Sequence, residues 1–205
     1  MRQRASPEDL DAATSTITEM ALESARSALE FGCREYLHWA ELFAERLEKV
    51  DDTELQKFAR AFSLCLLGQL PTRPETCPFC MQYGKDRSCI GCGYALTHGN
   101  CEAENSAFSQ FIEAFQEFGK AIYQETGKLC YSPELTRRSL EKAIHASSET
   151  SREMLNEIEK ASALRFMELK AHYIARMISL IPRDLFSDEI DLKYSFVKEK
   201  LKDYW

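Results

Sequence analysis

The chain has 205 residues, of which 44% are hydrophobic and 29% charged, and its net charge is −7. These values are ordinary for a soluble globular protein that buries one core without disulfides. The acidic balance and the lack of a Lys/Arg stripe argue against a protein that coats DNA or RNA, because phosphate contacts supply most non-specific affinity. The longest apolar run, at 63–70, is far shorter than the ~20 residues of a membrane helix, so no membrane insertion is expected.

The first ten residues, MRQRASPEDL, carry basic side chains without a following apolar segment, which is not the pattern of a secretory signal. We therefore expect a cytoplasmic protein. In that compartment clustered cysteines indicate metal or redox chemistry before they indicate disulfides. Only 8 Gly and 6 Pro residues are available for turns, which favours long elements over many short strands.

Two helical segments are predicted in the first 70 residues. Ser6 is a natural N-cap, and apolar residues recur at helical spacing over 7–49. Gly32 is the expected bend or break in this segment. A capping-box pattern at 51–54 then begins a helix that ends near residue 69, before two prolines.

Helical patterns return after the first hundred residues. A helix that begins near 105 and stops at Gly127 carries large apolar residues at steps of three and four: Phe108, Phe111, Phe115, Phe118 and Ile122. Ser132 then caps a helix that is predicted to run unbroken to Ile181. Within it the small polar stretch 145–151 is either solvated or a close helix crossing. A short helix over 188–203 closes the chain.

These patterns predict an all-α protein with one helical domain over residues 1–205. The expected architecture is a bundle of four to six helices, some of them long, with a Cys-rich metal knuckle inserted at 71–104. The insert concentrates glycines and prolines, so we expect little or no regular helix within it.

The insert holds five of the eight cysteines. Two CxxC motifs lie eight residues apart, and each lets two thiolates reach one metal ion from a tight turn. Together they supply a tetrahedral sulfur set, which suits Zn²⁺. The predicted zinc ligands are therefore Cys77, Cys80, Cys89 and Cys92.

Two further residues leave this ligand set open, because Cys101 or His98 could replace one of the four cysteines. The metal is open as well, since four cysteines also suit an iron–sulfur cluster. Glu35 and His38 have the i, i+3 spacing found in di-iron bundles. That chemistry needs a second such pair, so a solvated helix-surface pair is favoured.

Residues 77–108 carry short motifs in a fixed order: CPFC, a second CxxC, Gly99-Asn100-Cys101, and Ser106 followed by Phe108. This series resembles small uncharacterised archaeal and phage proteins with a metal knuckle. Gly93 stands where those proteins usually carry a proline. The resemblance implies metal binding, and the helical remainder of the chain suggests no family.

A zinc ion with four thiolate ligands has no open position, so it stabilises a fold and does not activate a substrate. Nucleotide-binding and zinc-protease motifs are absent from the sequence. We expect a non-enzymatic, zinc-stabilised helical adaptor or regulatory protein whose knuckle contacts a protein partner or a second copy in a homodimer. The alternatives are an iron–sulfur redox or electron-transfer protein and a nucleic-acid-associated regulator. The latter would use Lys85 and Arg87, and the acidic charge counts against it.

Overall fold

The computed structural model describes residues 5–84, 89–126 and 131–205, and this part of the chain is helical, without strands. The all-α class is confirmed. The described residues form nine α-helices: α1 (Pro7–Ser15), α2 (Glu19–Leu47), α3 (Leu55–Gly68), α4 (Pro78–Tyr83), α5 (Gly93–His98), α6 (Ala107–Gln124), α7 (Pro133–Ile158), α8 (Ala163–Ser179) and α9 (Asp188–Leu201). Three short 3-10 turns join them: η1 (Asp52–Glu54), η2 (Pro74–Thr76) and η3 (Arg183–Leu185).

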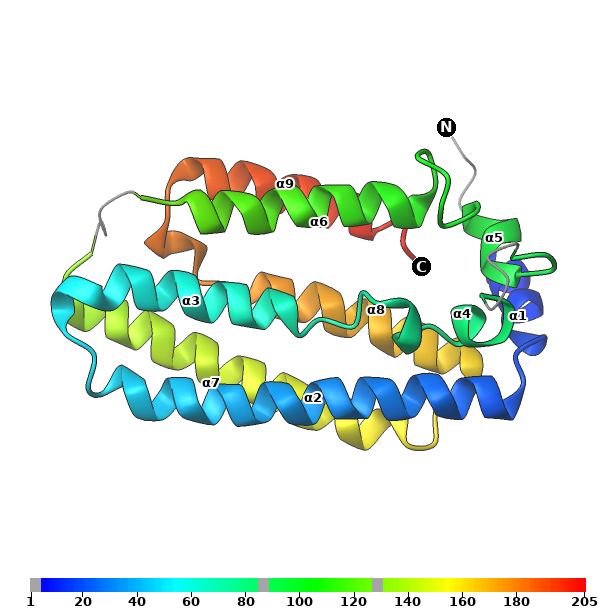
Figure 1. Ribbon diagram of the computed structural model, residues 1–205, viewed down its shortest axis with the longest axis horizontal. Coiled ribbons are helices and arrows are strands. Elements are labelled where there is room, and N and C mark those ends of the chain that lie inside the picture. Colours follow the sequence, from blue (N-terminus) through cyan, green and yellow to red (C-terminus); the bar gives the residue numbers. More distant parts are fainter. Residues whose placement is uncertain (1–4, 85–88, 127–130) are drawn as a thin grey trace.

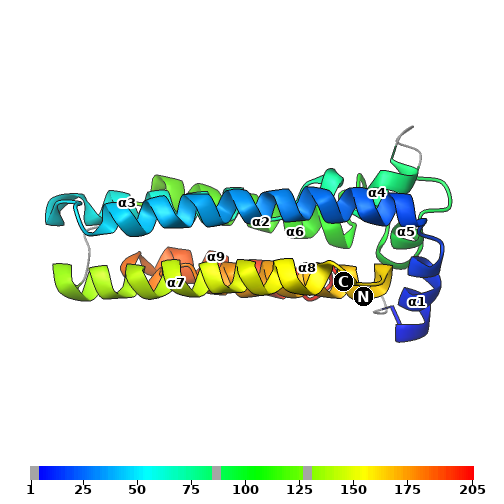
Figure 2. The ribbon, with the colours of Figure 1, turned by 90° about the horizontal axis from the view of Figure 1, so that it is seen from below.

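The six longer helices form a bundle of two layers (Figures 1 and 2). One layer holds α2, α3 and α6, and the other holds α7, α8 and α9, with α2 packed on α7 and α6 packed on α9. The short helices α1, α4 and α5 gather at one end. The expected four to six helices therefore roughly describe the bundle, but the described residues contain more, because the start of the chain and the insert add three short helices.

The apolar face predicted for α6 lies in the core. Phe111, Phe118 and Ile122 are fully buried. The ring of Phe111 lies 5.2 Å from that of Tyr204, and the ring of Phe118 lies 6.2 Å from that of Tyr194. α6 ends at Gln124, and the expected stop Gly127 lies outside the described residues. Among the described helices, none combines the length and apolar character needed to cross a membrane.

The first predicted helix is broken, but not at Gly32. α1 ends at Ser15 and α2 begins at Glu19, with the Thr18 side chain accepting a hydrogen bond from the Ala21 backbone N–H. α2 runs through Gly32 without interruption. The break follows from the N-cap preference of threonine, which competes with helix continuation through its side-chain oxygen.

The helix predicted to run unbroken to Ile181 is two antiparallel helices, α7 and α8. The Ser162 side chain caps α8 by accepting from the Arg165 backbone N–H at 3.3 Å. Arg26, buried on α2, donates to the carbonyls of Ile158 and Ala161 at 2.9 and 3.0 Å. These carbonyls belong to the turn, where helix termini leave acceptors unpaired, so the arginine stabilises the reversal.

The polar stretch at 145–151 is a close helix crossing, one of the two predicted alternatives. Ser147 and Ser151 are fully buried where α7 packs against α2 and α8. The Tyr36 hydroxyl donates to Ser147 Oγ at 2.6 Å, and Tyr173 and Ser151 share a hydrogen bond of 2.8 Å. The small side chains let the helices approach each other. The tyrosine hydroxyls form hydrogen bonds with the serine hydroxyls that the crossing buries.

We expect Ser147→Ala to lower the free energy of unfolding by about 1–3 kcal/mol, because it leaves the buried Tyr36 hydroxyl without its acceptor. Tyr36→Phe should have a smaller effect, since Ser147 keeps its bonds to the Ala143 and Ile144 carbonyls. Urea unfolding measures both. Ser195→Ala is the control, because Ser195 makes the same kind of bond on an exposed helix face. Equal losses for Ser147→Ala and Ser195→Ala would contradict the buried pairing.

Candidate metal centre

The Cys-rich insert contains more regular helix than expected. Cys77 is the N-cap residue of α4 and Pro78 occupies its first position, where a proline loses no helical hydrogen bond. Cys92 is likewise the N-cap residue of α5. One cysteine of each CxxC motif thus stands at the start of a short helix, which the glycine and proline content of the insert did not reveal.

All five cysteines of the insert line one cavity of about 320 Å³. The described cysteines are free thiols, so no disulfide joins them. The structure therefore brings together the four predicted ligands and also Cys101. The lining is completed by residues from the insert, α6, α8 and the C-terminus: Arg73, Pro74, Phe79, Gly84, Tyr94, Ala95, Glu102, Phe108, Lys170 and Tyr204.

The second CxxC motif adopts a tight turn with unusual backbone angles. The Cys92 backbone N–H donates to the Cys89 carbonyl at 3.1 Å. Cys89 has a φ of 50° and is the only described non-glycine residue with a positive value, while Gly91 has a φ of 78°. Left-handed backbone is unfavourable for a side chain like that of cysteine, and such strain gathers at functional sites.

The first CxxC motif holds two interacting thiols. A hydrogen bond from Cys80, together with the nearby charge of Lys170, lowers the pKa of Cys77, whereas the same hydrogen bond and burial raise the pKa of Cys80. Burial, together with the nearby thiols of Cys77, Cys92 and Cys89, raises the pKa of Cys101 to about 12. The five sulfurs therefore lie within electrostatic range of one another, so a cation among them would stabilise several thiolates at once.

Lys170 brings a positive charge into the wall of the cavity. It lies on α8, is 1% exposed, and donates from Nζ to the Thr76 carbonyl at 2.8 Å. Its Nζ also lies 5.9 Å from the centre of the Tyr204 ring. Burial lowers the pKa of Lys170, and the thiols of Cys77, Cys80 and Cys101 oppose that shift. Lys170 was not predicted from the sequence, where it is one lysine in a helix far from the insert.

An aromatic stack that includes Tyr94 of the cavity lining lies beside the site. The His98 ring stacks on Tyr94 at 4.4 Å and on Trp205 at 5.3 Å, and its Nδ1 lies 2.6 Å from Thr97 Oγ1. The Tyr94 hydroxyl donates to the Tyr204 carbonyl at 2.9 Å. His98 is not among the described residues that line the cavity. This placement favours ligand sets made of cysteines alone.

The side chains surround a space and do not converge on a point. Among residues 5–84, 89–126 and 131–205, no three His, Cys, Asp or Glu side chains form a ready-made metal site. The Glu35/His38 pair considered for a di-iron site is not part of such a group either. His38 is exposed on its helix. Metal coordination would require the cysteine side chains to turn inward.

The short helices form one packed unit, the end cap, which consists of α1, α4 and α5. Gln82 of α4 accepts from the Thr18 backbone N–H and donates to the Thr16 carbonyl, both at 2.7 Å. Gly93 of α5 lies so close to α1 that an added Cβ would come within 2.7 Å of the Ala13 backbone. This contact explains why a residue without a side chain follows the second CxxC motif.

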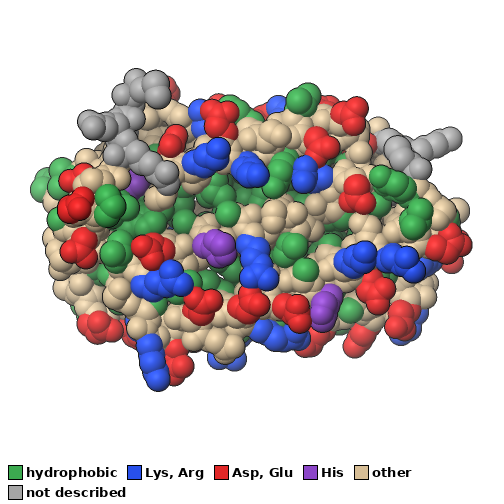
Figure 3. Space-filling model, turned by 180° about the vertical axis from the view of Figure 1, so that it is seen from behind, with side chains coloured by type: hydrophobic (Ala, Val, Ile, Leu, Met, Phe, Trp, Pro, Cys, Tyr) green, Lys and Arg blue, Asp and Glu red, His purple; other side chains and the backbone are tan. Residues whose placement is uncertain are grey.

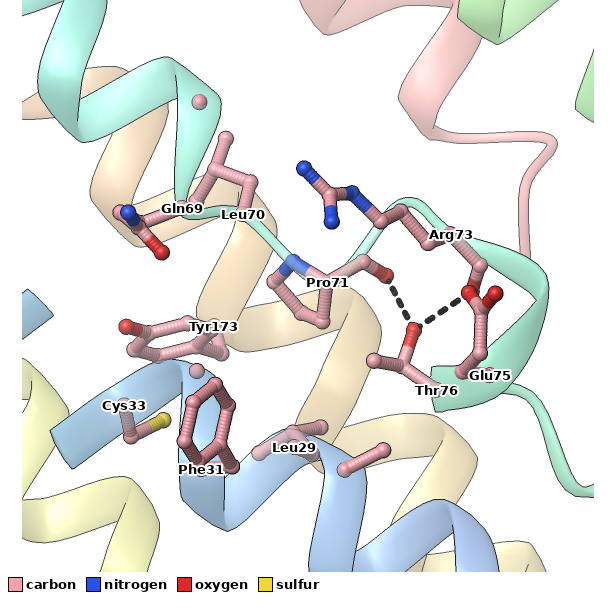
Figure 4. Close-up of a pocket in the computed structure, with 13 residues that line it drawn as sticks. Leu29, Phe31, Cys33, Gln69, Leu70, Pro71, Arg73, Glu75, Thr76 and Tyr173 are labelled. Atoms are coloured by element: carbon pink, nitrogen blue, oxygen red, sulfur yellow. Dashed lines mark hydrogen bonds between the residues drawn. The ribbon is translucent and has the colours of Figure 1, made fainter. Parts of the chain in front are cut away.

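A second cavity of about 270 Å³ lies beside the insert, between α2, the end of α3 and η2 (Figure 4). Phe31, Cys33 and Tyr173 line one side of it. On the other side Thr76 donates to the Pro71 and Arg73 carbonyls at 3.0 and 2.8 Å. These two bonds of the Thr76 hydroxyl stabilise η2. The Thr76 carbonyl in turn accepts the hydrogen bond from Lys170.

The surface carries charges of both signs. Figure 3 shows Lys/Arg and Asp/Glu side chains interspersed over one face, with apolar side chains between them. Lys85 and Arg87, the proposed nucleic-acid contacts, lie outside the described residues. Two apolar side chains of the insert, Ile90 and Leu96, are each 82% exposed. Ile90 lies within the second cysteine turn, and Leu96 lies on the helix that follows it.

Comparisons with known proteins return no match: no protein-family model, no curated protein and no solved structure is significantly similar to this chain. The functional argument therefore depends on the geometry of the cysteine cavity.

Gly93→Ala should lower the free energy of unfolding by about 1–3 kcal/mol, because the new methyl group forces α1 away from α5. Gly68→Ala is a matched control, since an added Cβ there meets no atom within 4 Å, and it should raise stability by about 0.4–1 kcal/mol. Thermal unfolding and hydrogen exchange in α1 measure both. Unchanged exchange in α1 of the Gly93 variant would argue against the close packing.

Proposed function

We propose that this protein is a non-enzymatic, metal-stabilised helical adaptor of the cytoplasm. A zinc–thiolate centre holds the end cap in shape, and the neighbouring surface binds a protein partner. The observation that carries the proposal is the gathering of five reduced cysteines around one cavity with a buried lysine in its wall.

The chemistry of the donor set fits a thiophilic metal. Cysteine thiolates are preferred ligands of zinc, and a structural zinc site takes four of them. We propose four ligands: Cys77, Cys80, Cys89 and Cys92. Cys101 is the alternative to one of them. Zinc would supply folding energy here, since a bound ion links α4 to the turn before α5 and so closes the insert on itself.

An iron–sulfur cluster is the second candidate, and the cavity itself favours it. A space of about 320 Å³ with a largely aromatic and thiol lining is larger than one ion needs, and four of its five cysteines could hold a cluster. In that case the protein would be a redox or electron-transfer protein.

The proposed partner surface consists of two exposed apolar side chains of the insert, Ile90 and Leu96. Ile90 follows the first cysteine of its turn, and Leu96 lies on α5, so the fold of the insert fixes both positions. Exposed apolar side chains on a rigid support are typical of interaction sites. A second copy of the chain would be a partner of the same kind.

Protein purified without oxygen should contain about one zinc per chain and have no visible absorption. Cys77→Ser and Cys89→Ser should abolish zinc binding, because each removes a proposed ligand. Chelation should increase proteolysis and hydrogen exchange within 71–104 and leave the bundle folded. Elemental analysis with an absorption spectrum measures the metal content.

Cys65→Ser is the matched control, since Cys65 is a half-buried thiol on α3 outside the cavity, and it should keep its zinc. Iron in place of zinc, together with visible absorption, would favour the second candidate, the iron–sulfur protein. Protein that contains neither metal would refute the proposed centre.

A photo-crosslinking amino acid at position 96 should capture a protein partner in the native cells, or a second copy of the chain. The same probe at position 192 is the control, because Leu192 is 73% exposed on α9, outside the end cap. Capture at position 96 should disappear in the Cys77→Ser background, where the support of the surface is lost. Equal capture at both positions, or capture that survives metal loss, would count against this surface.

A further inference from the structure

Lys170 is the charged residue that the bundle contributes to the cysteine cavity. It comes from α8, which lies outside the insert, and its side chain is buried where the two parts of the molecule meet. The other charged residues of the described lining, Arg73 and Glu102, are exposed to solvent. Their charges are therefore screened by water, whereas that of Lys170 acts inside the cavity.

No carboxylate of the described residues compensates the charge of Lys170. An ammonium group has three donors, and one of them bonds the Thr76 carbonyl at 2.8 Å. Within the described part of the chain, no carboxylate lies within ion-pair distance of Lys170; the ion pairs there involve other residues. A buried charge is strongly unfavourable without a counter-charge. Among the described residues, the thiols of Cys77, Cys80 and Cys101 are the acidic groups that favour its charged form.

We propose that Lys170 is the positioning residue that compensates the negative charge of the metal centre, an inference that rests on the proposed function. A divalent ion with four thiolates carries a net charge of −2, and a cationic lysine beside it brings the buried total to −1. Without that lysine the full charge of −2 is buried. Lys170 therefore lowers the electrostatic cost of burying four thiolates together.

The same residue also anchors the insert, because its bond to the Thr76 carbonyl fixes the backbone next to Cys77. Compensation of charge and anchoring by a hydrogen bond predict different results for two neutral substitutions. Lys170→Gln removes the charge and keeps an N–H donor that could reach the carbonyl. Lys170→Met removes both and keeps the apolar length of the side chain.

The test is zinc affinity, measured by competition with a chromophoric chelator for the wild type and the two variants. We expect both variants to bind zinc about 10–100-fold more weakly, as is typical when a group outside the ligand shell is lost. Co²⁺ in place of zinc gives a second readout, since its absorption reports how many thiolates bind. Both variants should still show thiolate coordination, but at higher Co²⁺ concentration.

Lys193→Met is the control, because Lys193 is a half-buried lysine on α9 that pairs with Glu117 outside the cavity, and its zinc affinity should be unchanged. Wild-type affinity in both Lys170 variants would overturn the inference. A loss confined to Lys170→Met, with Lys170→Gln normal, would also overturn it and assign Lys170 the anchoring role alone. If the wild-type protein binds neither zinc nor iron, the proposed function fails first and this inference fails with it. Should Lys170→Met not fold, Lys170→Gln against the wild type still decides the charge effect.

Discussion

The end cap is built from helices too short to be stable alone, and the rest of the site depends on how they are held. α1 has nine residues, and α4 and α5 have six each, whereas isolated helices shorter than about 12–15 residues are marginal in water. Tertiary contacts must therefore supply their stability. The Gln82 amide bridges the α1–α2 turn, Gly93 lets α5 approach α1 at backbone distance, and Tyr94 and His98 of α5 stack with Trp205.

The cysteine site also belongs to the bundle, although its sulfurs all come from the insert. Phe108 of α6, Lys170 of α8 and Tyr204 of the C-terminus form part of the cavity wall. Negative charge beside Lys170 would stabilise its charged form in this buried position, and the cysteines are placed to carry that charge. Under the proposed function, metal binding and the docking of the insert onto α8 would thus stabilise each other.

The sequence predicted most of the helices because their signals are local. The caps Ser6 and Ser132 and the apolar face of α6 lie where the patterns placed them. The two missed helix breaks, before Glu19 and after Ile158, contain neither glycine nor proline, and they depend on Thr18, Ser162 and the distant Arg26. The CxxC spacing likewise predicted that the thiols would share one site, but no local pattern could show that Lys170 joins them.

α8 connects the cysteine cavity to the interior of the bundle. Lys170 and Tyr173 are three residues apart, so they share one side of the helix. Lys170 faces the cysteines, while Tyr173 lines the second cavity and hydrogen-bonds Ser151 in the crossing with α7. Thr76 lines the second cavity, and its carbonyl accepts the hydrogen bond from Lys170 of the cysteine cavity. A change in the charge of the cysteine site would therefore act on η2 and on the packing of α8, and so reach the bundle through rigid, buried contacts.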